Sequence, residues 1–177
     1  MKRKVFLLSV ATILVTAVQA QIGYKGQVTL SVNGGINSLM GYVADAATGV
    51  YISSHSILGV GAMFDRTGYD ASQNDSFDAT QWFGEFHYQY AVPLNKFILR
   101  PSGGFLMGAE SCDPISRQGN LLPYNNQFVY GMFVEFGMEY VFCRHWALTL
   151  NPRFQYLMKT HFDKLKISGG LGLKYYF

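Results

Sequence analysis

The stretch Lys164–Phe177, KLKISGGLGLKYYF, ends the chain and decides the fold. Its side chains alternate between an apolar and a polar face, and a period of two indicates a β-strand. The apolar face consists of Leu165, Ile167, Leu171, Leu173, Tyr175 and Phe177, and the polar face of Lys166, Ser168, Gly170, Gly172 and Lys174. A closed barrel pairs its last strand with its first, so that no strand edge faces lipid. We therefore expect this strand, which continues to a terminal aromatic residue, to close an outer-membrane barrel.

Residues 1–20 predict a secretory signal peptide. A basic start, Lys2–Lys4, precedes an apolar run that is short for a spanning helix, and the small-residue pattern Val18–Ala20 predicts cleavage before Gln21. The alternative is an N-terminal membrane anchor. We expect an exported chain with a signal peptide at 1–20 and an outer-membrane β-barrel at 21–177.

The charge balance gives no sign of a nucleic-acid partner. The chain has 14 basic and 11 acidic residues, and removing Lys2, Arg3 and Lys4 with the signal peptide leaves 11 of each. A balanced chain without a basic patch is not expected to bind nucleic acid directly. The 16% aromatic and 14% charged residues fit a surface that faces hydrocarbon.

Period-two alternation recurs along the mature chain and predicts eight strands. They span 26–35, 48–54, 57–66, 80–92, 96–108, 127–142, 146–157 and 164–177, with 39–47 ambiguous. The links after the second, fourth and sixth strands are short, whereas the others, including polar loops at 67–78 and 109–126, are longer. Short periplasmic turns, longer outside loops and an even strand number are typical of outer-membrane barrels. We predict an all-β fold, an eight-stranded antiparallel up-and-down transmembrane β-barrel in the outer membrane of a Gram-negative cell.

The main soluble alternative is a lipocalin-type barrel, which is apolar inside. It would bring the nearly continuous aromatic faces inward, and an eight-stranded barrel has room for only a packed set of side chains. The inverted arrangement, with aromatic residues outward and charged residues inward, fits the pattern.

Seven charged side chains on the polar face form the predicted lumen network. They are Glu85, Arg100, Glu135, Glu139, Arg153, Lys166 and Lys174. One interpretation is an ion or solute path. The other is a hydrogen-bonded plug of ion pairs, which we favour because eight strands leave little room for an open channel.

Aromatic residues near the strand ends form a predicted girdle on the lipid face. They are Trp82, Tyr90, Phe97, Tyr140, Trp146, Tyr156 and Tyr175. Rings with an apolar body and a polar tip settle at the level of the lipid headgroups. Outer-membrane lipid is therefore an expected partner.

No grouping of residues predicts catalysis, a cofactor or a metal. Ser54 and Ser56 flank His55, but in a tight turn without an acid to orient the ring, and His161 and Asp163 share a loop without a neighbouring Ser. No histidine pair has the spacing of a metal site. We expect a non-enzymatic protein.

The two cysteines, Cys112 and Cys143, are predicted at opposite ends of one long strand. An even count in an exported protein is typical of a disulfide. At ~3.3 Å per residue, however, the strand separates them by several tens of Å, whereas a disulfide requires Cα atoms within roughly 7 Å. We predict two unbridged thiols.

Most of the mature chain resembles the TraO family of conjugal transfer proteins. The resemblance lies in Lys25-Gly26, Phe128–Gly131, Cys143–His145, Leu148–Arg153, His161-Phe162 and Gly170–Lys174. It implies an outer-membrane component of a mating apparatus that works with other conjugal transfer proteins, and it supplies no catalytic residues. The alternative is a general small barrel that stabilises the envelope or binds a surface partner.

The last strand is also similar to the terminal signal of outer-membrane barrels. Gly172, Tyr175 and Phe177 stand at the positions of that signal. The similarity implies recognition by the barrel-assembly machinery.

Overall fold

The computed structural model describes residues 23–72, 75–112 and 126–177, so the predicted signal peptide at 1–20 lies outside the described residues. The strands are β1 (Val28–Asn37), β2 (Tyr42–Tyr51), β3 (Ser56–Ser72), β4 (Asp75–Tyr90), β5 (Val92–Leu94), β6 (Phe97–Cys112), β7 (Gln127–Val141), β8 (Trp146–Lys159) and β9 (Leu165–Tyr176). No helix among the described residues is long and apolar enough to cross a membrane.

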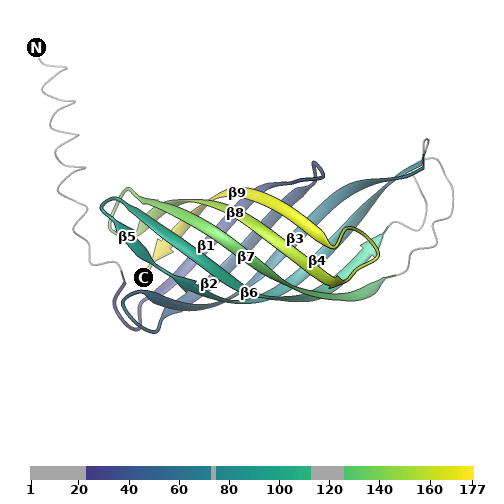
Figure 1. Ribbon diagram of the computed structural model, residues 1–177. Helices are drawn as coiled ribbons and strands as arrows, with labels where there is room; N and C mark the ends of the chain where they lie inside the picture. Colours follow the sequence, from purple (N-terminus) through teal and green to yellow (C-terminus); the bar gives the residue numbers. More distant parts are fainter. Residues whose placement is uncertain (1–22, 73–74, 113–125) are drawn as a thin grey trace, which may run out of the picture.

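The strands close into an eight-stranded antiparallel barrel (Figure 1). Each pairs with its neighbour in the chain, and β9 returns to pair with β1 from Thr29↔Tyr176 to Asn37↔Ser168. The short β5 continues β4 after Ala91, and both pair with β6. β4 and β5 therefore count as one strand of the barrel. The predicted fold class is confirmed. We call the end where β1 begins and β9 ends the terminal end, and the opposite end the distal end.

Strand boundaries at the distal end differ from the prediction. The second strand begins at Tyr42, six residues early, and the link before it at 38–41 is short. The predicted loop at 67–78 is wrong for most of its length, because β3 continues to Ser72 and β4 starts at Asp75. Ladder hydrogen bonds between the backbones of β3 and β4 extend the hairpin regardless of side-chain polarity. Likewise β6 reaches Cys112 along β4, and the rest of the predicted loop at 109–126 falls largely outside the described residues.

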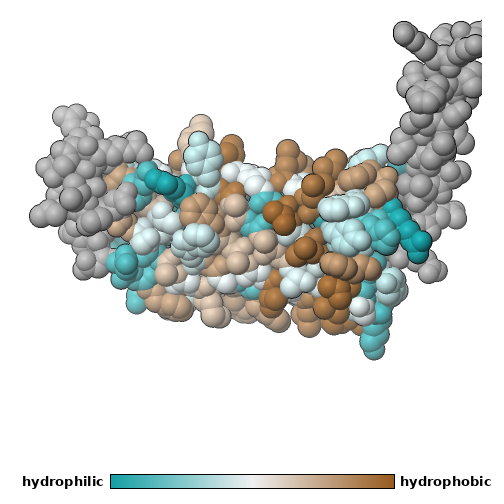
Figure 2. All heavy atoms as spheres, turned by 180° about the vertical axis from the view of Figure 1, so that it is seen from behind, coloured by the Kyte–Doolittle hydropathy of each residue, from teal (hydrophilic) through white to brown (hydrophobic). Residues whose placement is uncertain are grey.

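The wall is apolar outside and mixed inside. Along β6, Phe105 is 61% exposed and the adjacent Leu106 is 1% exposed, because successive side chains point to opposite faces. Figure 2 shows brown and pale side chains over the middle of the visible wall, with hydrophilic ones gathered towards its ends. The aromatic-outward arrangement predicted against a lipocalin-type interior is the one observed.

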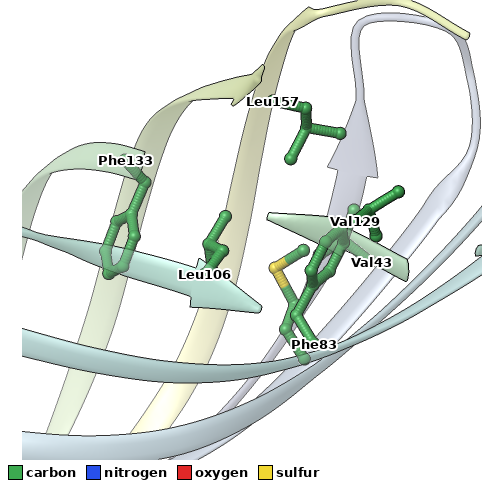
Figure 3. Packing of buried hydrophobic residues seen from close by; sticks show 7 residues of the cluster. Val43, Phe83, Leu106, Val129, Phe133 and Leu157 are labelled. Carbon is green, nitrogen blue, oxygen red and sulfur yellow. The ribbon is translucent and has the colours of Figure 1, made fainter. Parts of the chain in front are cut away.

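Two apolar layers cross the interior. The terminal apolar layer consists of Tyr51, Ile57, Ala91, Ile98, Val141, Ala147 and Tyr176. The distal apolar layer consists of Val43, Met63, Phe83, Leu106, Val129, Phe133 and Leu157, which enter from different strands (Figure 3). The inner face is therefore apolar in two sections and polar in the others. Ile57 and Met63, which interrupt the polar face of β3 in the sequence, are members of these layers.

The two cysteines lie at opposite ends of the barrel, as predicted. Cys112 ends β6 at the distal end, and Cys143 lies in the turn after β7 at the terminal end. No disulfide joins them.

Candidate functional site

The structure places all seven residues of the predicted lumen network inside the barrel. Each is at most 7% exposed, although each is charged. They do not form one network but three clusters, which succeed one another along the barrel. Along β4 the inward residues run from His87 through Glu85 and Phe83 to Gln81, so the distal apolar layer separates two of the clusters.

The Arg100 cluster lies next to the terminal apolar layer. Arg100 Nε is 2.6 Å from Glu139 Oε1, and Lys174 Nζ is 3.0 Å from the same oxygen. Arg100 Nη2 also donates to the hydroxyls of Tyr51 and Tyr176 at 2.9 and 2.7 Å. The Tyr176 hydroxyl in turn donates to Glu139 Oε2 at 2.5 Å. Glu139 is thus held by two cations and a phenol.

The Arg153 cluster occupies the middle of the interior. Its guanidinium bridges two carboxylates, with Nη1 2.8 Å from Glu85 Oε2 and Nη2 2.7 Å from Glu135 Oε2. The guanidinium carbon also lies 4.4 Å from the centre of the Phe133 ring, a distance at which a cation is attracted by the face of an aromatic ring. His87 Nδ1 approaches Glu85 Oε1 at 3.5 Å. A planar guanidinium suits this bridging because it presents several donors in fixed directions.

Glycines on β3 make room for the carboxylate and the imidazole. A Cβ added at Gly59 would lie 2.1 Å from His87 Nε2, and one at Gly61 would lie 2.8 Å from Glu85 Oε1. Any larger residue at Gly59 would displace the ring of His87.

The Lys166 cluster lies beyond the distal apolar layer. Lys166 Nζ is 3.1 Å from Asp65 Oδ2 and donates to Gln81 Oε1 at 2.7 Å. Gln81 then donates to Glu110 Oε2 at 2.5 Å. Glu110 also accepts from Gln127, Thr160 and the backbone N–H of His161. This cluster therefore ties β9 to β3, β4 and β6.

Several members of these clusters were absent from the predicted set. They are Asp65, Glu110, His87, Tyr51 and Tyr176. Four of them, Asp65, His87, Tyr51 and Tyr176, can be identified from the alternation of side chains along a strand. His87 and Tyr176 each stand two residues from a predicted inward residue, Glu85 and Lys174. Asp65 and Tyr51 lie on the polar face of their own strands. Glu110 was missed because the sequence pattern predicts a loop at 109–126.

The aromatic girdle falls into two bands on the exterior. Tyr90, Phe97, Tyr140, Trp146 and Tyr175 lie near the terminal end, and Trp82 and Tyr156 lie nearer the distal end. Ring contacts join neighbours within the terminal-end band, among them Trp146 with Tyr175 at 4.9 Å and Phe97 with Tyr140 at 5.3 Å. Trp146 and Tyr156 stand ten residues apart on β8, about 33 Å along the strand. At a tilt of about 40° this is about 25 Å along the axis, the height of an outer-membrane apolar band.

The residues of the predicted assembly signal lie beside the barrel seam. Tyr175 packs against Phe177 at 4.8 Å. A Cβ at Gly172 would lie 2.0 Å from Asn33 Oδ1, and that oxygen accepts hydrogen bonds from Thr149 and Asn151. Close packing against Asn33 at the β1–β9 seam therefore favours glycine at position 172.

The Ser and His of the tight turn lie in contact at the surface. Ser54 Oγ is 2.7 Å from His55 Nδ1, and both are exposed. The ring of His55 stacks on Tyr90, and no described carboxylate pairs with it. Among the described residues no group of three or more His, Cys, Asp or Glu side chains is arranged to hold a metal ion.

No protein-family model matches the sequence, and the comparison with curated proteins finds no match either. Solved structures do match. The N-terminal β-barrel domain of Pseudomonas aeruginosa OprF is 14% identical with a TM-score of 0.57, over 86% of this chain and 98% of that one. The attachment invasion locus protein Ail of Yersinia pestis is 11% identical with a TM-score of 0.56, over 86% and 99%.

The outer-membrane protein OprG of Pseudomonas aeruginosa is 12% identical with a TM-score of 0.56, over 90% of this chain and 99% of that one. At these identities the likeness concerns the fold alone. The chain therefore has the fold of the small outer-membrane β-barrels.

Replacing Arg153 with Met should destabilise the barrel strongly. The change leaves the carboxylates of Glu85 and Glu135 buried without the guanidinium between them, which costs roughly 3–5 kcal/mol. Urea unfolding of the protein in detergent micelles measures the loss. Arg66→Met is the control, because the Arg66 side chain is 54% exposed and its pair with Asp78 lies at the surface. Such pairs contribute at most about 1 kcal/mol, so equal losses for the two variants would contradict the account.

Proposed function

We propose that this chain is a closed, non-enzymatic barrel of the outer membrane that serves the envelope or binds a surface partner. The observation that carries the proposal is the filled interior under an apolar exterior. Three ion clusters and two apolar layers occupy the space through which a solute would pass. What remains for contact with other molecules is the exterior and the two ends.

The exterior supports placement in the outer membrane. The aromatic bands are spaced as in barrels that span this membrane, and the pairing of β9 with β1 closes the wall so that no strand edge is left open to lipid. Export by a cleaved signal peptide and insertion by the barrel-assembly machinery follow from the N-terminal and C-terminal patterns.

The distal end supports a surface role. β3 continues six residues past Arg66, where its pairing with β2 ends, so the β3–β4 hairpin rises above the β1–β2 hairpin. In Figure 1 this hairpin projects beyond the neighbouring strands. Ail, which shares the fold, was crystallised with a heparin analogue, so a barrel of this size is able to bind a ligand.

A more specific role is carried by the resemblance to TraO proteins. Phe128–Gly131 at the distal start of β7, Cys143–His145 and Leu148–Arg153 bear that resemblance. In this role the barrel works with other conjugal transfer proteins as an outer-membrane part of a mating apparatus. The filled interior then means that DNA does not pass through the barrel itself.

Fractionation tests the location. We expect the protein in the outer-membrane fraction, and we expect unboiled and boiled samples to migrate differently on a gel because a closed barrel resists unfolding by detergent. Soluble protein that shows no shift would refute the proposal.

Conductance tests the closed interior. The purified protein in planar lipid bilayers should show no stable, large conductance, since two apolar layers and three ion clusters block the path. An open porin in the same bilayers is the positive control. A reproducible large conductance would mean that the interior opens in lipid.

A mating assay separates the two roles. In-frame deletion of the gene should lower transfer frequency, with restoration by a plasmid copy, if the chain acts in conjugation. Normal transfer frequency after deletion would leave the envelope or surface role.

A further inference from the structure

A small polar cavity of about 20 Å³ lies between the Arg100 and Arg153 clusters. Three atoms on its wall have no hydrogen-bond partner: Glu85 Oε1, His87 Nδ1 and Ser102 Oγ. All three residues are buried, with exposures of 5, 3 and 8%. Nearly all buried polar atoms in folded proteins are partnered. Glu85 Oε1 and His87 Nδ1 lie 3.5 Å apart, too far for a strong hydrogen bond, and Ser102 Oγ has no partner, so the cavity offers these atoms to a small ligand.

The charges around the cavity do not balance. Four carboxylates face three permanent cations on its wall: Asp45, Glu85, Glu135 and Glu139 against Arg100, Arg153 and Lys174. Among these seven groups one negative charge is in excess. Excess buried charge is costly, so one further positive charge would stabilise this layer of the interior.

We propose that the cavity binds one monovalent cation, Na⁺ or K⁺. Glu85 Oε1 and Ser102 Oγ are its ligands, and His87 Nδ1 lies beside it. The cavity has room for about one water-sized particle, and carboxylate and hydroxyl oxygens are ligands that hard cations prefer. A single charge restores neutrality.

The donor set disfavours a divalent or transition metal. Among the described residues no three His, Cys, Asp or Glu side chains converge as metal ligands. All four carboxylates already have a partner: Glu85 and Glu135 pair with Arg153, Glu139 pairs with Arg100 and Lys174, and Asp45 accepts from Asn33. Glu85 Oε1 is the one oxygen among them that is fully buried without a hydrogen bond.

The test is refolding in different salts. The full barrel is refolded from urea into micelles in sodium, potassium or choline chloride at equal ionic strength, and the urea equilibrium is measured in each. We expect higher stability in sodium or potassium than in choline, which is too large for the cavity, and comparison of the first two identifies the preferred ion. At ten times its Kd, a bound cation raises the folding equilibrium constant about elevenfold.

Variants locate the effect. Glu85→Gln and Ser102→Ala should each abolish the difference between salts, and Ser102→Ala keeps every ion pair if Glu85→Gln fails to fold. Ser168→Ala is the matched control, because Ser168 is also a buried serine but does not line this cavity; it should keep the difference. Equal stability of the wild type in all three salts would overturn the proposal. Salt dependence that survives in both cavity variants would overturn it as well.

Discussion

A charged side chain inside a barrel coated by hydrocarbon must find its partners within the barrel, and the rest of the structure depends on this constraint. Removing an ion from water costs several kcal/mol even after relaxation, and an unpaired ion recovers none of it. Every permanent cation of the predicted network has a carboxylate partner: Arg100 and Lys174 share Glu139, Arg153 bridges Glu85 and Glu135, and Lys166 pairs with Asp65. These contacts join strands that are far apart in the sequence. The buried charges, which are costly when unpaired, therefore also hold the barrel together.

The same constraint explains the apolar layers. An eight-stranded barrel has an interior just wide enough for side chains, and large residues such as Phe83, Phe133 and Leu106 fill the sections that charges do not. Water is then kept from the ion pairs, which strengthens them. The interior becomes a stack of ionic and apolar sections. That stack is why we assign the function to the surfaces of the barrel and not to a path through it.

The sequence predicts the wall well because one physical rule governs it. Alternation places Lys166 and Lys174 inside and Tyr175 outside without any knowledge of the partners. Pairing is different, because Asp65 lies 101 residues from Lys166 and only the closed register brings them together. The distal extension of the β3–β4 hairpin into residues 67–78 was also missed, because backbone ladder hydrogen bonds stabilise strands where the side chains are typical of a loop. Fold follows from local patterns here, whereas the composition of each ion cluster follows from closure.

The apolar exterior faces lipid in this structure, and the two tryptophans test that placement directly. Trp82 and Trp146 are the chain's two tryptophans, and both are exposed on the wall, one in each aromatic band. The decisive measurement is tryptophan fluorescence in bilayers of lipids brominated at different depths. We predict quenching by bromine near the headgroups and weaker quenching by bromine at the mid-plane. Fluorescence that no brominated lipid quenches would contradict the claim.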